Sequence, residues 1–174
     1  MTDQTYNLPE DIVALARRVV AANVAAGRSI ALAESCTGGL VAAAITEVAG
    51  SSAVLECSFV TYSNGAKQKL LGVAGDIIET FGAVSPACAW AMAQGALRHS
   101  TADVAVAISG IAGPDGGTAQ KPVGLVVFAR ATRGNPEVVA EEHRFDDTGR
   151  TDIRRQAALV ALELLMPPEP PAEA

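Results

Sequence analysis

The chain has 174 residues, of which 49% are hydrophobic, 18% charged and only 4% aromatic. A chain of this length can bury a core without disulfides, and its apolar content excludes an intrinsically disordered protein. The formal net charge of −6 and the lack of a basic stripe argue against direct nucleic-acid binding, because neutralising phosphates supplies most of the affinity of such proteins. We expect one domain over residues 1–166 and a disordered, proline-rich tail over 167–174.

Cysteine usage and the N-terminal sequence predict a cytoplasmic protein. The three cysteines, Cys36, Cys57 and Cys88, lack the spacing of metal ligands, so no metal site is expected. No signal peptide is evident, and no apolar run reaches the roughly 18 residues that span a bilayer. We therefore expect reduced thiols and no membrane partner. The many small apolar residues favour a homo-oligomer.

Helical periodicity with capping residues predicts helices, and short apolar runs predict strands. In chain order we expect a helix from about Leu8, capped by Asn7 and stopped by Gly27; a strand at 29–33; a helix at 40–48; a strand at 57–62; helices at 66–71, 76–81 and 86–100; strands at 103–108, 123–130 and 137–145; and a helix at 152–165. Helices interleaved with apolar strands, then a hairpin, indicate a three-layer α/β domain. Its five-stranded sheet is mixed and mostly parallel, with one antiparallel member.

Three segments of unusual composition follow predicted strands, at residues 34–39, 61–67 and 109–117. Ligands of open parallel sheets bind in the crevice beyond the carboxyl ends of the strands. We therefore expect the three segments to converge on one crevice and to carry the chemistry of the protein.

The first segment, Glu34-Ser35-Cys36-Thr37-Gly38-Gly39, places a serine between a strand and a helix. The free N–H groups at a helix start can stabilise an oxyanion in acyl transfer or hold a phosphate. Alternatively, Ser35 or Thr37 only caps the helix. Cys36 is a rival nucleophile, because a helix N-terminus lowers the pKa of a thiol, although no histidine is evident to pair with it.

The second segment contains Tyr62, Asn64 and Lys67. Asn64 is a good N-cap, which places Lys67 at the third helical position. The positive helix end and partial burial both disfavour the charged form of a lysine there, so Lys67 can act as a general base toward a serine. Tyr62 can relay a proton or orient that lysine. The alternative is that Lys67 is a solvated surface residue.

The third segment, Ser109 to Gly117, is rich in glycine. Glycines let the backbone approach a ligand closely, and successive N–H groups can hold an anion. The segment matches neither a Walker loop nor the dinucleotide-binding fingerprint. The alternative is a long flexible turn, in which Asp115 is a turn former.

Short motifs follow one another in order through most of the chain. They are Ala33-Glu34-Ser35-Cys36-Thr37-Gly38-Gly39, Gly50-Ser51-Ser52, Phe59-Val60-Thr61-Tyr62-Ser63-Asn64, Ala66-Lys67, Leu71-Gly72-Val73, Gly82-Ala83-Val84-Ser85, Ile108 to Gly117, Lys121-Pro122-Val123-Gly124 and Arg154-Arg155-Gln156. Together they resemble the C-terminal domain of the competence/damage-inducible protein CinA, the nicotinamide-nucleotide amidase family. Gly65 departs from that pattern, since the family is often acidic at this position.

The resemblance implies a three-layer α/β/α sandwich that hydrolyses nicotinamide mononucleotide to nicotinate mononucleotide and ammonia, in pyridine nucleotide recycling. It also implies a serine–lysine mechanism without metal or cofactor, with Ser35 as nucleophile, Lys67 as base and Tyr62 assisting. The implied substrate site contains Glu34, Cys36, Thr37, Gly38, Gly39, Asn64, Ser109, Gly110 and Gly113, with the phosphate on the glycine-rich segment or on Arg150 or Arg154.

Two other functions stay open at this point. The same crevice can belong to a non-catalytic nucleotide- or phosphate-binding module, in which Lys67 is charged and holds the phosphate. The chain can also be a partner-binding domain associated with competence and DNA damage. Release of ammonia from nicotinamide mononucleotide separates the amidase from both.

Overall fold

The computed structural model describes residues 8–146 and 148–168, and its centre is a five-stranded sheet in the order β2-β1-β3-β4-β5. The strands are β1 (Ile30–Glu34), β2 (Leu55–Val60), β3 (Val104–Gly110), β4 (Leu125–Thr132) and β5 (Val138–Arg144). Strand β1 pairs in parallel with β2 and β3, whereas β4 pairs antiparallel with both β3 and β5. Strand β4 is thus the antiparallel member, and the predicted mixed sheet is confirmed.

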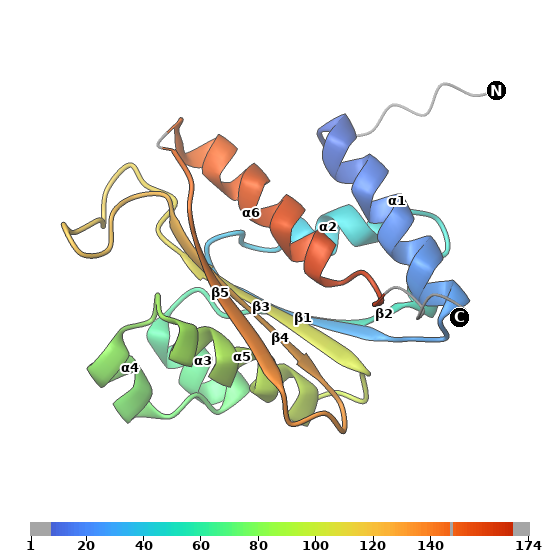
Figure 1. Ribbon diagram of the computed structural model, residues 1–174, viewed down its shortest axis with the longest axis horizontal. Helices are drawn as coiled ribbons and strands as arrows, with labels where there is room; N and C mark the ends of the chain where they lie inside the picture. Colours follow the sequence, from blue (N-terminus) through green and yellow to red (C-terminus); the bar gives the residue numbers. More distant parts are fainter. Residues whose placement is uncertain (1–7, 147, 169–174) are drawn as a thin grey trace, which may run out of the picture.

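Helices cover both faces of this sheet (Figure 1). Helices α1 (Glu10–Ala25), α2 (Leu40–Thr46) and α6 (Arg150–Leu164) lie on one face, and α3 (Asn64–Leu71), α4 (Gly75–Phe81) and α5 (Pro86–Arg98) lie on the other. A short 3-10 helix, η1 (Ser51–Ala53), precedes β2. No helix in the described part of the chain has the length and hydrophobicity needed to cross a membrane. The layers match the predicted α/β/α sandwich.

Side-chain size on the central strand matches the two faces it serves. Alternate residues of β3 point to opposite faces of the sheet. Val104, Val106 and Ile108 belong to the core under α1, α2 and α6, whereas Ala105 and Ala107 belong to the core under α5. Helix α5 is itself rich in alanine on the side that it buries. Small residues on both surfaces let α5 pack closely on the sheet.

The predicted elements are present, but several boundaries differ. The first helix begins at Glu10 with Pro9 at its N-cap, and the predicted cap Asn7 lies outside the described residues. Strand β3 continues through Gly110, so Ser109 belongs to the strand and not to a loop. The predicted tail lies outside the described residues from 169 onward.

Helix α3 begins one residue earlier than its predicted cap allows. The Ser63 hydroxyl, not the Asn64 side chain, accepts a hydrogen bond from the Ala66 N–H at 3.1 Å, so the prediction of Asn64 as N-cap is wrong. Lys67 therefore lies at the fourth helical position, still in the first turn. The hydroxyl of Ser63 satisfies one of the free N–H groups of the helix start, as an N-cap residue does.

The parallel strands bring the chemical segments together. In the β1 register Glu34 lies opposite Val60 of β2 and Ile108 of β3. Strand β1 is continued by two bonds: the Thr61 N–H donates to the Glu34 carbonyl at 2.8 Å, and the Ser35 N–H donates to the Ile108 carbonyl at 2.9 Å. The three segments therefore start side by side at one edge of the sheet, as predicted.

Candidate active site

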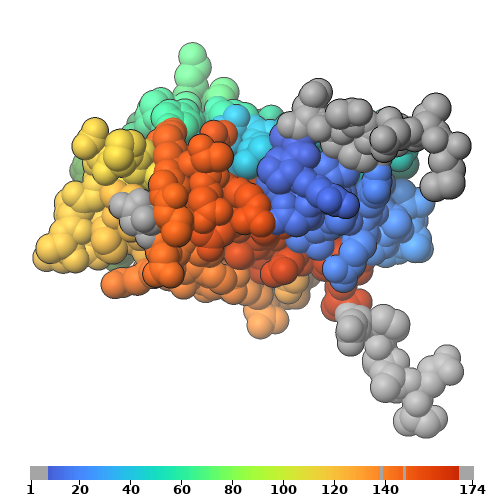
Figure 2. Space-filling view, turned by 90° about the horizontal axis from the view of Figure 1, so that it is seen from above, coloured from blue at the N-terminus to red at the C-terminus, as the bar shows by residue number. Residues whose placement is uncertain are grey.

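A cavity of about 260 Å³ lies at this edge of the sheet. Its wall is formed by residues from all three segments and from the start of α6: Ser35, Cys36, Tyr62, 110–113, 115, 116 and Arg150. In Figure 2 the glycine-rich loop (yellow) lies beside the chain that leads through β5 into α6 (orange), at one end of the molecule. The expected convergence on one crevice is therefore observed.

Ser35 lines this cavity and contacts Lys67, which is not part of the cavity wall. Lys67 Nζ lies 3.0 Å from Ser35 Oγ and 2.8 Å from the Thr61 carbonyl oxygen. The lysine is 1% exposed and the serine 7%, so Lys67 is not the solvated surface residue of the alternative interpretation. No carboxylate among the described residues forms an ion pair with Lys67.

The surroundings of Lys67 favour its neutral form. Burial lowers its pKa below the ordinary value of a lysine, and the nearby Cys88 and Cys36 thiols oppose this only in part. Lys67 also lies in the first turn of α3, where the positive end of the helix dipole disfavours an ammonium group. A neutral amine can donate to the Thr61 carbonyl and keep its lone pair for the Ser35 proton. That is the geometry of a nucleophile with its base.

The carboxylate of Glu34, which the resemblance places in the substrate site, faces the start of α2. This buried carboxylate accepts hydrogen bonds from the N–H groups of Gly39 (3.0 Å), Val41 (3.2 Å) and Ala42 (2.9 Å). The N–H groups at the start of α2 are thus occupied by a side chain and are not free to hold an oxyanion, which corrects that expectation. Glu34 itself is not part of the cavity wall.

The turn after Ser35 has other free donors. Within the described residues, no oxygen atom accepts a hydrogen bond from the Cys36 N–H or the Thr37 N–H, which interact with the Cys36 thiol sulfur, whereas the Gly38 N–H donates to the Ser35 carbonyl at 3.0 Å. Gly38 and Gly39 both have positive φ, 61° and 94°, a region that favours glycine. The turn therefore leaves two adjacent N–H groups directly after the nucleophile.

Cys36 lines the cavity, but its thiol is not activated. Burial, together with the negative charge of Glu34, raises its pKa to about 12, against the opposing effects of the Cys36 N–H, Lys67 and the Thr37 N–H. The expected lowering by a helix start does not occur, because the N–H groups of α2 face Glu34. The structure thus argues against Cys36 as the nucleophile.

Neither the Tyr62 side chain nor the Asn64 side chain forms a hydrogen bond with Lys67. Tyr62 is on the cavity wall and 60% exposed, and its hydroxyl accepts a hydrogen bond from Arg150 Nη2 at 2.9 Å. Lys67 is oriented by the Thr61 carbonyl and not by Tyr62. Asn64 is exposed and is not part of the cavity wall.

Arg150 and Arg154 lie one turn apart on α6, and their side chains contact different parts of the site. Arg150 lines the cavity, and its Nη1 donates to the Gly113 carbonyl at 2.8 Å. Arg154 is not on the cavity wall, and its Nη2 donates to the Thr37 carbonyl at 2.8 Å. Of the two predicted phosphate ligands, only Arg150 faces the cavity, and Arg154 supports the turn that carries Ser35.

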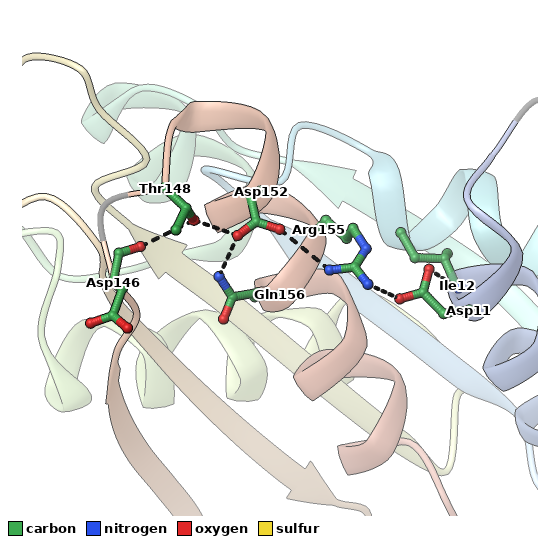
Figure 3. Close-up of polar contacts among 7 residues, drawn as sticks. All are labelled: Asp11, Ile12, Asp146, Thr148, Asp152, Arg155 and Gln156. Carbon is green, nitrogen blue, oxygen red and sulfur yellow. Dashed lines mark hydrogen bonds and ion pairs between the residues drawn. The ribbon is translucent and has the colours of Figure 1, made fainter.

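The other two residues of the Arg154-Arg155-Gln156 motif belong to a network that connects α6 to α1 and to the segment before α6 (Figure 3). Arg155 forms ion pairs with Asp11 of α1 and, at 3.3 Å, with Asp152, whose carboxylate also accepts from Gln156 at 2.9 Å. Thr148 donates to the same Asp152 carboxylate just before α6 begins. This network lies outside the cavity and stabilises the position of the helix that presents Arg150.

The third segment requires glycine because its backbone is crowded. A Cβ on Gly110 would lie 2.8 Å from Val126 Cγ2 and 2.9 Å from the Leu125 carbonyl oxygen. Gly113 has a φ of 75°, and a Cβ there would lie 2.6 Å from a methyl group of Val123. Both glycines line the cavity, so the loop is shaped and not a loose turn.

Ser109, which precedes them, is buried with its hydroxyl turned elsewhere. Its Oγ donates to the Ala83 carbonyl at 2.7 Å and anchors the end of β3 to the connection between α4 and α5. The sequence does not predict the role of the Thr61 carbonyl as a partner of Lys67. Asp115, which the sequence favours as a turn former, lies on the cavity wall. No group of three or more histidine, cysteine, aspartate or glutamate side chains in the described ranges is placed to hold a metal ion.

Comparisons with known proteins agree with this fold. The family model for the CinA C-terminal domain matches residues 12–167. The nicotinamide-nucleotide amidohydrolase PncC of Escherichia coli (strain K12) is 48% identical over 155 residues, covering 89% of this chain and 93% of that protein. The crystal structure of the competence/damage inducible protein CihA from Agrobacterium tumefaciens is 51% identical, with a TM-score of 0.89, and the match covers 92% of this chain and 97% of that one.

Longer relatives also match. A CinA-like protein of Mycolicibacterium vanbaalenii is 53% identical over 144 residues, which cover 83% of this chain. The chain spans only 34% of the length of that relative, and 34% of a competence-damage inducible protein of Symbiobacterium thermophilum.

Proposed function

Since this chain belongs to the CinA C-terminal domain family, we propose that it hydrolyses the carboxamide of nicotinamide mononucleotide to nicotinate mononucleotide and ammonia. The observation that carries the proposal is the buried contact of 3.0 Å between Ser35 Oγ and Lys67 Nζ beside a cavity. Two relatives of similar length are named nicotinamide-nucleotide amidohydrolases. A lysine with a lowered pKa next to a serine hydroxyl suits acyl transfer from an amide.

In the first half of the reaction, the neutral Lys67 amine takes the Ser35 proton as the hydroxyl oxygen attacks the carboxamide carbon. The carbonyl oxygen becomes an oxyanion, and the free N–H groups of Cys36 and Thr37 are the donors next to it. The protonated Lys67 then gives its proton to the departing nitrogen. Ammonia leaves, and an ester to Ser35 Oγ remains.

In the second half, a water molecule attacks the carbon of that ester, and Lys67 takes one of its protons. The same two N–H groups hold the oxyanion. The tetrahedral intermediate collapses, the Lys67 proton returns to Ser35 Oγ, and the carboxylic acid is released. Water thereby supplies the hydroxyl group of the product and one hydrogen of the ammonia.

The charged groups on the cavity wall complement the substrate. Arg150 is the basic side chain that lines the cavity within the described ranges, so we assign the phosphate to it and to the neighbouring glycine-rich loop. Tyr62 holds Arg150 from the other side through its hydroxyl. Tyr62 therefore assists substrate binding through Arg150, which differs from the predicted role of orienting the lysine.

The test is to incubate the purified protein with nicotinamide mononucleotide and to measure ammonia and nicotinate mononucleotide together. We expect Ser35→Ala to abolish turnover while binding, measured by calorimetry, survives. Ser52→Ala, a matched change at an exposed position on η1, leaves turnover unchanged. A folded wild-type protein that binds the nucleotide without releasing ammonia would be a binding module, and one that does neither would favour the partner-binding alternative.

We also propose that the enzyme acts in the cytoplasm and self-associates. Exposed apolar side chains on the face formed by α3, α4 and α5, namely Leu70, Phe81 and Trp90, support the second part. Sedimentation analysis of the purified protein tests self-association, and fractionation of the source cells tests the location.

A further inference from the structure

Glu34 is a completely buried carboxylate that directly precedes the proposed nucleophile. Transferring a carboxylate from water into a protein interior is costly unless the charge is compensated. No lysine or arginine among the described residues forms an ion pair with Glu34. Its compensation comes from the backbone, through the N–H groups of Gly39, Val41 and Ala42 at the positive end of α2.

These bonds connect the two ends of the nucleophile turn, residues 34–39, which joins β1 to α2. On the strand side, the Ser35 N–H donates to Ile108 of β3, which holds the backbone of Ser35 against the sheet. On the helix side, the Glu34 carboxylate reaches across the turn to the first residues of α2. Ser35 lies between these two anchors, so the position of its Oγ relative to Lys67 depends on both.

The same bonds decide which backbone donors of this turn stay free. With the start of α2 occupied by Glu34, the free N–H groups of this turn are those of Cys36 and Thr37. The carboxylate charge is also directed at the helix and not at Lys67, whose Nζ contacts are Ser35 and the Thr61 carbonyl. A carboxylate paired with Lys67 would hold it as an ammonium and remove the base.

We propose that Glu34 is a positioning residue, a carboxylate that clamps the nucleophile turn to α2 and thereby aims Ser35 Oγ at Lys67 and the Cys36 and Thr37 N–H groups at the oxyanion. This inference rests on the proposed function, because it explains how that site is held. It differs from a substrate-binding role for Glu34, and it differs from an electrostatic role toward Lys67. The three roles predict different kinetic results.

The test uses Glu34→Gln, Glu34→Asp and the control Glu47→Gln at the other end of α2. Glutamine keeps the size but turns an amide N–H₂ against a backbone N–H, and aspartate keeps the charge but is too short to reach all three donors. We expect both to lower kcat by about 10- to 100-fold, because a misplacement of about 1 Å at a nucleophile has such an effect, with KM changed less than about threefold. Glu47→Gln behaves as wild type.

Two further readouts separate positioning from the other roles. The pH midpoint of the acid limb of kcat/KM stays unchanged in Glu34→Gln, whereas loss of a negative charge acting on Lys67 would move it to lower pH. The rate at which a fluorophosphonate labels Ser35, followed by mass spectrometry, falls together with kcat. A rise in KM with unchanged kcat and labelling, or a wild-type rate in Glu34→Asp, overturns the proposal.

The labelling experiment also keeps this inference apart from the proposed function. If the wild-type protein does not release ammonia from nicotinamide mononucleotide, the proposed function fails. The difference in Ser35 labelling between the wild type and the two Glu34 variants still tests the clamp. Equal labelling of all folded variants would show that Glu34 does not position the serine.

Discussion

The two sides of the cavity are built in opposite ways. On the nucleophile side, residues 34–39, the backbone is held by hydrogen bonds to the buried Glu34 carboxylate, to the buried Ile108 carbonyl and to the half-buried Arg154. On the opposite side, residues 110–117, the shape depends on missing side chains, since Gly110 and Gly113 have no room for a Cβ. Hydrogen bonds therefore fix the nucleophile side, whereas the absence of Cβ atoms fixes the shape of the glycine-rich side.

The difference follows from what each side has to do. A nucleophile and its base must keep a separation near 3 Å, which many directional bonds can secure. A surface that accepts a nucleotide must instead leave space and present backbone donors, which glycine allows. We therefore expect substitutions on the nucleophile side to lower kcat, and substitutions on the glycine side to raise KM or to lower stability.

Lys67→Met, like Ser35→Ala, should lower kcat more than the other substitutions considered. A smaller effect would contradict the view that the nucleophile side controls kcat. Without the base, kcat should fall by at least about 10³-fold. Removing one member of a catalytic unit lowers kcat about as much as removing all of its members. In the wild type, kcat/KM should rise with pH through the lowered lysine pKa. The measurement is ammonia release against pH, with Lys69→Met, an exposed lysine on the same helix, as the control.

The same variant makes a prediction about stability. The pKa of Lys67 is lowered in the folded state, whereas an unfolded lysine titrates near about 10.4. Between these two values the unfolded chain binds more protons, so the free energy of unfolding of the wild type rises with pH in that window. Lys67→Met should remove this rise. Urea unfolding at neutral pH and near pH 10 checks it, and an unchanged slope would contradict the lowered pKa.

Gly110→Ala tests the other side. The new Cβ would meet Val126 and the Leu125 backbone, so β3 and β4 must shift, and we expect a loss of about 1–3 kcal/mol in the free energy of unfolding. The cavity wall would move with them and kcat/KM should fall by about tenfold. Chemical denaturation and steady-state kinetics measure both.

Gly65→Ala is the matched control. Gly65 lies in the first turn of α3, and a Cβ there has no atom within 4 Å. This change should stabilise the protein by about 0.5–1 kcal/mol, because alanine is the better helix former, with activity unchanged. If both alanine variants behave alike, crowding of the glycine-rich side is not what shapes the cavity.

The fold could be predicted well from the sequence because its signals are local. Buried apolar runs, caps such as Ser85 and the order of elements were sufficient for the layers and for the single antiparallel strand. Boundaries were less accurate where two neighbouring residues can perform the same task, as Ser63 and Asn64 can at the start of α3. Which of them caps the helix depends on backbone angles that residue types do not specify.

The sequence predicts which residues form the site but not how they contact one another. Ser35 and Lys67 stood out by their motifs, but they are 32 positions apart, and their contact depends on how β1 and α3 lie in space. The role of Thr61 is not predictable, because it belongs to a backbone carbonyl, which every residue type has. The contacts of Glu34 are not predictable either, because no sequence pattern shows that α2 turns its N–H groups back toward this carboxylate.

Arg150→Gln should have a moderate effect, limited to substrate binding. It removes the charge that faces the cavity and the bonds to Gly113 and Tyr62. Because a hydrogen bond to a charged group contributes about 1.5–3 kcal/mol, KM should rise about tenfold or more, with kcat changed less than about threefold. Initial rates over a range of substrate concentrations separate the two constants.

Arg155→Gln serves as the control, since Arg155 pairs with Asp11 and Asp152 away from the cavity. Its KM should equal that of the wild type, although the ends of α1 and α6 lose an ion pair. An unchanged KM in Arg150→Gln would assign the phosphate to the backbone of the glycine-rich loop alone.

Cys36→Ala should have the smallest effect of all, although Cys36 is adjacent to the nucleophile and lines the cavity. Burial raises the pKa of its thiol to about 12, so the thiol stays protonated at any pH at which the enzyme is assayed. The part of Cys36 that the mechanism uses is its backbone N–H, which alanine retains. We expect kcat and KM within about threefold of the wild type and an unaltered alkaline limb of the pH profile, because a thiol with so high a pKa does not contribute to it. Full loss of turnover in a folded Cys36→Ala protein, with Ser35→Ala still active, would transfer the nucleophile to the thiol. The bonds that hold the turn would then serve Cys36 and not Ser35.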